Sequence, residues 1–239
     1  MRSIWARPCY CLSENDYMTI LSRRLSAATL LVCLLPAGAV LAQPRGRKAA
    51  TPDFAYYMLV LSYAPDFCDQ PNLKKDPLEC GAGRHIGFVV HGLWPQGEDS
   101  RGPEGCGDSS PVSQAIVQIT LRYVPTKSLI QHEWIAHGSC SGLSSEDYFA
   151  ALRKARDSIT LPADLNQPSQ KLQLSPAQVE SKVAAANPSL PRAAFRASCY
   201  RDDELQDVRV CLNKDLSPRA CGSSAGKCPA STVTLLPVR

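Results

Sequence analysis

The feature that most constrains this chain is its set of cysteines. Eleven cysteines occur in 239 residues, and three of them lie before residue 42. The other eight are Cys68, Cys80, Cys106, Cys140, Cys199, Cys211, Cys221 and Cys228. An even number in an exported chain predicts four disulfides formed in an oxidising compartment, although spacing alone leaves their pairing open. None of these cysteines shows the paired C-x-x-C spacing of a structural zinc site.

The N-terminal segment is typical of an exported protein. Arg23 and Arg24 precede an apolar run at 27–41, which ends in small residues. This is the pattern of a secretory signal peptide, and we expect cleavage after Ala42. The run is shorter than the ~20 residues that a membrane-spanning helix needs. Residues 1–17 precede a second methionine, so a true start at Met18 and a long leader both remain open.

The rest of the chain is expected to fold as one domain. The length of the full sequence and its hydrophobic content of 44% are ordinary for a globular protein. We assign residues 1–42 to the signal peptide, 43–52 to a flexible segment and 53–239 to a single domain. The mature form is expected to be secreted or periplasmic, with no membrane segment. The full sequence has a net charge of +4, and without the leader it is about +2. This allows weak attraction to a polyanion but does not discriminate between functions.

The order of the expected elements favours the α+β class. Aromatic and aliphatic runs predict strands at 54–63, 86–90, 193–200 and 208–213. Periodicity and capping residues predict helices at 112–124, 132–140, from Ser144 onward and at 175–187. Loops are expected at 68–84, 95–111, 160–176 and 214–230. Strands and helices do not alternate regularly, which argues against a doubly wound parallel sheet.

Three of the four histidines lie in two unusual segments. Residues 88–96 read FVVHGLWPQ and residues 132–140 read HEWIAHGSC. In a regular helix, at about 100° per residue, His132, Glu133 and His137 would share one face. Trp134 and Ile135 would point the other way, into apolar packing.

Two or more imidazoles and a carboxylate suit RNA cleavage. One group takes the proton from the 2′-hydroxyl, and another protonates the departing 5′ oxygen. Histidine serves both roles, because its ordinary pKa of about 6.5 allows either form near neutrality. The zinc peptidase motif has histidines four residues apart, whereas His132 and His137 are five apart and too splayed for one ion. The isolated His85 is expected to be non-catalytic.

Both histidine segments resemble the active-site signatures of the ribonuclease T2 family. The matching residues are His-Gly-Leu-Trp-Pro at 91–95 and His-Glu-Trp-x-x-His-Gly-x-Cys at 132–140. Segments at 61–68, 175–180 and 208–216 are also similar, the last one to the bacterial branch. The resemblance implies an antiparallel sheet core flanked by helices. It also implies an endoribonuclease of low base specificity that cuts single-stranded RNA through a 2′,3′-cyclic phosphate, without metal or cofactor.

The resemblance assigns roles at the matching positions. His91 and His137 would form the acid–base pair; we favour His137 as base and His91 as acid, but the sequence leaves that order open. Glu133 would polarise the site and steady the pentacoordinate phosphate, and His132 would contact phosphate. Trp94 would pack on a catalytic histidine or on a sugar. DNA should resist cleavage, because it lacks the 2′-hydroxyl.

The resemblance also implies a disulfide pairing and shows one departure. The implied bridges are Cys68–Cys80, Cys106–Cys140, Cys199–Cys228 and Cys211–Cys221. A bridge at Cys140 is favoured over a Cys–His nucleophile with His137. Many family members carry lysine where this chain has Ala136, so two outcomes are open: activity is reduced, or another cation replaces the lysine. The candidates are Lys74, Lys75, Arg84 and Arg122.

Three other interpretations remain open. A catalytically silent relative would bind without cleaving, a metal-dependent hydrolase would need an ion, and a disulfide-rich structural domain would do neither. The expected partner is the RNA substrate alone, and the mature protein is expected to be a monomer.

Overall fold

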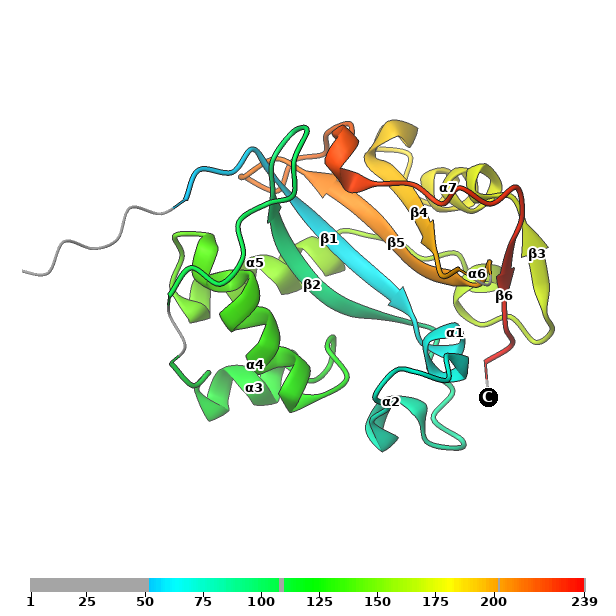
Figure 1. Cartoon of the computed structure of the whole chain (residues 1–239), viewed down its shortest axis with the longest axis horizontal. Coiled ribbons are helices and arrows are strands. Elements are labelled where there is room, and N and C mark those ends of the chain that lie inside the picture. The colour runs from blue at the N-terminus through cyan, green and yellow to red at the C-terminus, as the bar shows by residue number, and fades with distance from the viewer. Residues whose placement is uncertain (1–51, 108–109, 202, 239) are drawn as a thin grey trace, which may run out of the picture. The chain divides into compact units, whose positions relative to one another are not determined.

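A four-stranded antiparallel sheet forms the centre of the structure (Figure 1). This computed structural model describes residues 52–107, 110–201 and 203–238. The strand order is β2-β1-β5-β4. The strands are β1 (Tyr56–Tyr63), β2 (Phe88–Gln96), β4 (Phe195–Cys199) and β5 (Leu205–Leu212). All three pairings are antiparallel, which confirms the α+β prediction.

Strand β1 is buried along its whole length, because it is central in the sheet and both faces are covered. Alternate side chains point to opposite faces. Leu59 and Leu61 belong to the main hydrophobic core. Met58 and Val60 belong to a smaller core on the other face, with Cys211 from β5.

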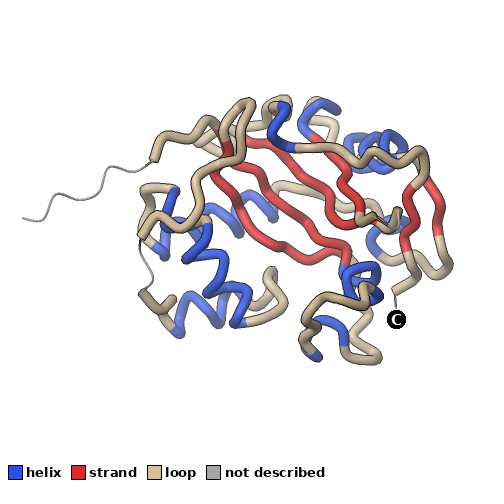
Figure 2. The backbone as a smooth tube through the Cα atoms, in the orientation of Figure 1, coloured by secondary structure: helices blue, strands red, loops and turns tan. Residues whose placement is uncertain are grey.

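Two of the longer helices pack beside the strands (Figure 2). Helix α5 (Ser145–Asp157) begins at Ser144, whose side chain accepts the Asp147 N–H, and it contacts β1 and β2. Its Tyr148 hydroxyl donates to the carbonyl of Leu93 at 3.0 Å, which ties the helix to β2. Helix α7 (Pro176–Ala185) packs against β4 and begins with a capping box of Ser175 and Gln178.

Helix α4 (Lys127–Ala136) contacts β2. Thr126 caps it by accepting the N–H of Leu129 at 3.1 Å. Helix α3 (Gln114–Thr120) contacts both α4 and α5. The remaining α-helices and β-strands are α1 (Ala64–Asp69), α2 (Pro77–Cys80), α6 (Ala163–Asn166), β3 (Leu172–Leu174) and β6 (Val233–Leu235).

Several element boundaries differ from the sequence predictions. Strand β2 continues to Gln96, so the expected loop at 95–111 starts too early and His91 lies inside the strand. The helix expected at 132–140 starts earlier, at Lys127, and stops at Ala136. Helices α1 and α2 occupy part of the expected loop at 68–84 and the residues just before it. These short elements lack a clear period, and tertiary packing rather than local pattern determines them.

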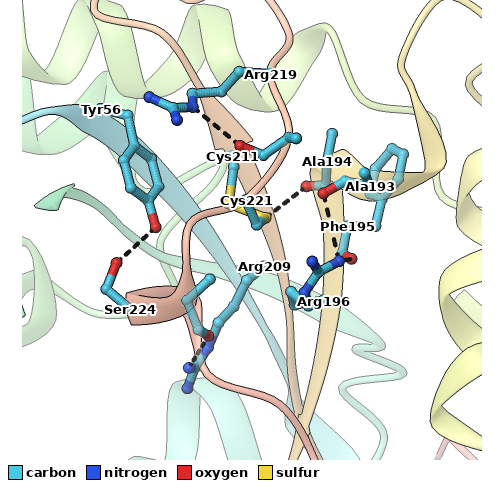
Figure 3. Close-up of a disulfide and its surroundings, with 12 residues drawn as sticks. Tyr56, Ala193, Ala194, Phe195, Arg196, Arg209, Cys211, Arg219, Cys221 and Ser224 are labelled. Atoms are coloured by element: carbon cyan, nitrogen blue, oxygen red, sulfur yellow. Dashed lines mark hydrogen bonds between the residues drawn. A yellow bond between two sulfur atoms is a disulfide. The ribbon is translucent and has the colours of Figure 1, made fainter. Parts of the chain in front are cut away.

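Four disulfides join the cysteine pairs that the resemblance implied. They are Cys68–Cys80, Cys106–Cys140, Cys199–Cys228 and Cys211–Cys221. Figure 3 shows Cys221 beside β4, where its sulfur contacts the carbonyl oxygen of Ala194 at 3.2 Å. Nearby, the Tyr56 and Ser224 hydroxyls are 2.9 Å apart (Figure 3). These contacts attach the C-terminal segment to the sheet.

The predicted signal peptide, its cleavage after Ala42 and the segment at 43–52 fall almost entirely outside the described residues. Within the described part of the chain, no helix combines the length and apolarity needed to cross a membrane.

Candidate active site

His91 lies at a β-bulge in β2. The register pairs Val60 with Gly92 and Leu61 with Val90, so His91 is an extra residue with no partner on β1. A bulge bends its strand and re-aims a side chain, and bulges recur beside active sites. The His91 Nδ1 lies 3.1 Å from the Ser62 Oγ, and the side chain is 36% exposed. The sheet therefore holds this imidazole from its inner side.

Glu133 and His137 come from the C-terminal end of α4. Glu133 is fully buried, and its backbone carbonyl accepts the His137 N–H at 3.1 Å. His137 ends the helix in a non-helical conformation, with φ −123° and ψ −47°, and is 7% exposed. A Cβ on Gly138 would lie 2.5 Å from the ring of Trp134, so a glycine allows this close turn. The break places His137 where a regular helix would not.

Trp94 connects the two histidines. Its ring is stacked on His137 with centroids 4.9 Å apart and an interplanar angle of 27°. His91 meets the same ring edge-on at 5.4 Å. The Trp94 Nε1–H donates to the Glu133 Oε2 at 2.9 Å, and the Glu133 Oε1 lies 3.5 Å from the His91 Nε2. One indole and one carboxyl group thus bring the two sequence segments together.

Two buried atoms of this cluster have no hydrogen-bond partner among the described residues. They are the Glu133 Oε1 and the His137 Nδ1. Most buried polar atoms in proteins are paired, and exceptions concentrate where a ligand or catalytic step uses them. Both atoms are therefore suited to contact a substrate.

Burial changes the proton affinity of all three groups. It raises the pKa of Glu133 to about 8; the Trp94 hydrogen bond opposes this, and Glu104 adds to it. Burial lowers the pKa of His137 to about 4, with smaller effects from His132 and His91. Burial also lowers the pKa of His91. At neutral pH, His137 is therefore neutral and Glu133 favours its protonated form.

A cavity of about 770 Å³ opens beside His91 and His132. His132 is exposed, and its ring centroid lies 6.5 Å from that of His137. Of the four cations considered as replacements at position 136, Lys74 and Lys75 line this cavity. The other lining residues include apolar Phe67, Leu73, Val89 and Leu129 and acidic Asp76 and Glu79.

The other candidate cations lie elsewhere. Arg84 lines a second, smaller cavity, where its Nε donates to the carbonyl of Leu78 at 2.8 Å. Arg122 is exposed and does not line the large cavity. The Ala136 carbonyl accepts the N–H of Gly105 at 2.8 Å, so the end of α4 is tied to the loop after β2.

The structure brings five predicted site residues to one place. They are His91, Trp94, His132, Glu133 and His137. One packing prediction was wrong: Ile135 is 38% exposed, because the helix presents it to solvent, whereas Trp134 is buried as expected. His85 is exposed and lines neither cavity.

Sequence reasoning missed Ser62, which contacts His91 from β1. It lies in an aromatic and aliphatic run that was assigned to a buried strand, and no local signal distinguishes it. Among the described residues, no group of three or more histidine, cysteine, aspartate or glutamate side chains is arranged to hold a metal ion.

A family model described as the ribonuclease T2 family matches residues 54–221. The chain belongs to the ribonuclease T2 family. It is 34% identical over 187 residues to a probable ribonuclease of Haemophilus influenzae, covering 71% of this chain and 65% of that protein. It is 31% identical over 183 residues to a ribonuclease of Aeromonas hydrophila, covering 70% and 76%. This chain thus spans slightly less than two thirds of the Haemophilus relative.

Structural similarity agrees with this ribonuclease T2 assignment. An RNase-related protein from Calystegia sepium superposes with a TM-score of 0.61 at 20% identity, over 77% of this chain and 98% of that one. At this identity the likeness shows the fold. The bacterial origin of both sequence relatives agrees with the branch indicated by residues 208–216.

Proposed function

We propose that this ribonuclease T2 chain is an exported endoribonuclease that cuts single-stranded RNA by histidine acid–base catalysis, with low base specificity. The observation that carries the proposal is the packing of His91 and His137 against one indole, that of Trp94. Two imidazoles held this way can act on one phosphodiester. Family membership supports RNA as the substrate.

The two imidazoles take different roles because their surroundings differ. The low pKa of His137 keeps it neutral, so it can remove the proton from the 2′-hydroxyl. The O2′ then attacks phosphorus and the bond from phosphorus to O5′ breaks. The His91 imidazolium protonates O5′ from its Nε2. The products are a 2′,3′-cyclic phosphate and a free 5′-hydroxyl.

Glu133 and His132 are suited to the charge that develops on the phosphate. Glu133 favours its protonated form below pH 8, so its Oε1 can donate to a phosphate oxygen. The exposed His132 can contact the same group. These groups supply donors at a site where this chain has Ala136 instead of a cation.

The cavity beside His91 accommodates a nucleotide next to the scissile phosphate. Phe67, Leu73 and Leu129 offer apolar contacts to a base, and Lys74 and Lys75 offer charge to a phosphate. Apolar contact and phosphate neutralisation do not read the edges of a base. Low base specificity follows from such a lining.

Activity should have a maximum on the acidic side of neutrality. The base must be deprotonated, so activity rises as pH increases through about 4, the pKa of His137. The acid must be protonated, and burial lowers the pKa of His91 below its ordinary value, so activity falls again before neutral pH. A bell-shaped profile of kcat/KM against pH is the expected result.

The test uses purified mature protein, polymeric RNA and single-stranded DNA of matched sequence, with EDTA, from pH 4 to pH 8. We expect cleavage of RNA only, with a cyclic phosphate terminus detected by mass spectrometry. His137→Ala, purified identically, is the control for contaminating host ribonuclease. Loss of activity in EDTA would favour the metal-dependent alternative. No cleavage at any pH would favour the catalytically silent relative.

A further inference from the structure

The hydroxyl that contacts His91 is buried. Ser62 is 8% exposed, and its Oγ lies 3.1 Å from the His91 Nδ1. The other ring nitrogen, Nε2, faces the Glu133 Oε1 at 3.5 Å. The two nitrogens of this imidazole therefore have different neighbours, one from the sheet and one from the catalytic cluster.

Ser62 begins a polar row that crosses the sheet. Its cross-strand neighbour on β5 is Asp207, and the neighbour of Asp207 on β4 is Ser198. Directly paired residues place their side chains on the same face. Asp207 is 2% exposed, and the Ser198 Oγ donates to its Oδ1 at 2.7 Å.

Asp207 is a buried carboxylate with a cationic partner. The Arg209 Nε donates to the Asp207 Oδ1 at 2.8 Å, and the Arg209 Nη1 donates to the Ala225 carbonyl at 2.6 Å. The guanidinium is thus anchored on the C-terminal segment. A buried charge is costly unless it is paired, and Arg209 supplies that partner for Asp207.

Titratable groups from several elements lie near His91. Glu133 and His132 approach from α4, His137 from the end of that helix, and Lys74 and Lys75 from the cavity wall. Burial, His132 and Arg209 lower the pKa of His91. Asp207 acts in the opposite direction and raises it.

We propose that Ser62 is a positioning residue that holds His91 by its Nδ1, and that Asp207 behind it favours the positively charged ring. The Nε2 then carries the proton that leaves for O5′. This inference rests on the proposed function for the identity of the proton acceptor. The orientation and charge of the ring are properties of the free protein.

The arrangement separates two tasks. When Ser62 accepts the Nδ1–H, the ring cannot turn and the exchangeable proton is confined to Nε2. Asp207 lies one strand further away, so it stabilises positive charge without competing for the proton. A histidine that acts as an acid needs both effects in a site whose burial otherwise favours the neutral ring.

The first experiment compares Ser62→Ala with Ser62→Thr, which keeps the hydroxyl. We expect Ser62→Ala to lower kcat about tenfold with little change in KM, as expected for loss of one orienting hydrogen bond. Ser62→Thr should restore most of kcat. The control is Thr120→Val, which removes another buried hydroxyl outside the candidate site. The Thr120 Oγ1 accepts a hydrogen bond from the Arg153 Nη1 at 3.3 Å.

The second experiment measures His91 directly by NMR, without RNA. Asp207→Asn should lower the pKa of His91 by about half a pH unit or more. Glu180→Gln is the matched control, because Glu180 is another shielded carboxylate paired with an arginine, at 3.2 Å from the Arg192 Nη2. That control should leave the His91 titration unchanged. Ring 15N shifts in Ser62→Ala should show loss of the fixed Nδ1–H tautomer.

The outcomes separate this inference from the proposed function. If wild-type protein cleaves no RNA but the NMR shifts follow the variants, the positioning stands and the ribonuclease proposal fails. If Ser62→Ala keeps the wild-type kcat and tautomer, Ser62 has no positioning role. If Asp207→Asn leaves the His91 pKa unchanged, Asp207 does not act on the ring. Should Asp207→Asn fail to fold, the Ser62 variants decide the proposal.

Discussion

The two segments that carry the proposed catalytic histidines hold them in different ways. His91 sits in the sheet, at a bulge, with Ser62 at one ring nitrogen and Glu133 near the other. His137 sits where α4 stops, stacked on Trp94, and its Nδ1 has no partner among the described residues. The first imidazole is held by polar neighbours, and the second by packing.

Under the proposed mechanism, this difference explains how one fold obtains an acid and a base from the same residue type. Partners with negative charge or hydrogen-bond acceptors favour the imidazolium, whereas apolar burial favours the neutral ring. Asp207 raises the pKa of His91, while only lowering effects act on His137. We therefore expect the loss of His91 and the loss of His137 to differ in how they affect cleavage of different substrates.

The largest expected effect is the loss of either histidine. His91→Ala and His137→Ala should each lower kcat on RNA about 10³-fold, with melting temperatures close to that of the wild type. A substrate whose 5′-nucleoside is replaced by p-nitrophenol separates the roles, because this leaving group needs no protonation. His91→Ala should cleave it nearly as well as the wild type does, and His137→Ala should not. The reverse pattern would show that the acid and base are exchanged.

A smaller loss of kcat is expected when the strand that carries Gly92 and the helix that carries Glu133 are forced apart. A Cβ on Gly92 would lie 1.8 Å from the Glu133 Oε2 and 2.6 Å from the Trp94 Nε1. Gly92→Ala should therefore displace Glu133 and lower kcat by about 10²-fold. In a Glu133→Ala background the same change should cost much less, since the displaced carboxyl is absent. Equal losses in both backgrounds would mean that Gly92→Ala acts through the strand alone.

Much of this comparison was predictable from the sequence. The run around Tyr56–Tyr63 predicts a strand, and Ser144 and Ser175 mark the starts of α5 and α7. These signals are local: a hydrophobic period and a capping side chain need no tertiary partner to be recognised. The unusual histidine segments likewise identified the family, which the family model confirmed.

The positions of the imidazoles were not predictable in the same way. A bulge at His91 depends on how β2 pairs with β1, and the helix break at His137 depends on the fit of Gly138 against Trp134. A helical wheel assumes a regular backbone, so it misplaces His137, which lies past the end of α4. The wheel also does not show which side of α4 packs on the core, and Ile135 was therefore wrongly expected to be buried. The sequence contains the chemistry, but long-range packing determines its geometry.

The disulfide near the end of α4 lies close in sequence to His137, the proposed base. Cys106–Cys140 joins the loop after β2 to the turn after His137, across 34 residues. Replacing both cysteines by alanine should lower the melting temperature and also lower kcat about tenfold, because the proposed base, His137, loses its fixed position. The control is the Cys199–Cys228 bridge, which spans 29 residues and involves β4. Its removal should lower the melting temperature to a similar degree and leave kcat unchanged.

The smallest expected effect is a pH-dependent change in stability at Glu133. Its pKa in the folded protein, about 8, lies above the ordinary value of 4.5. The folded state therefore binds its proton more tightly than the unfolded chain does. The associated stability is complete below pH 4.5 and is lost as pH rises through 8. Glu133→Gln cannot titrate, so it escapes this loss.

The measurement compares the melting temperatures of Glu133→Gln and wild type at pH 5 and pH 8. The melting temperature of Glu133→Gln minus that of the wild type should be several degrees higher at pH 8 than at pH 5. Asp66 and Glu79 also have raised pKa values, about 8 and about 7, and they lower the stability of both proteins equally. The difference between the two proteins thus isolates Glu133. A constant difference would mean that Glu133 is ionised throughout, and that its contact with His91 is an ion pair rather than a site for a phosphate oxygen.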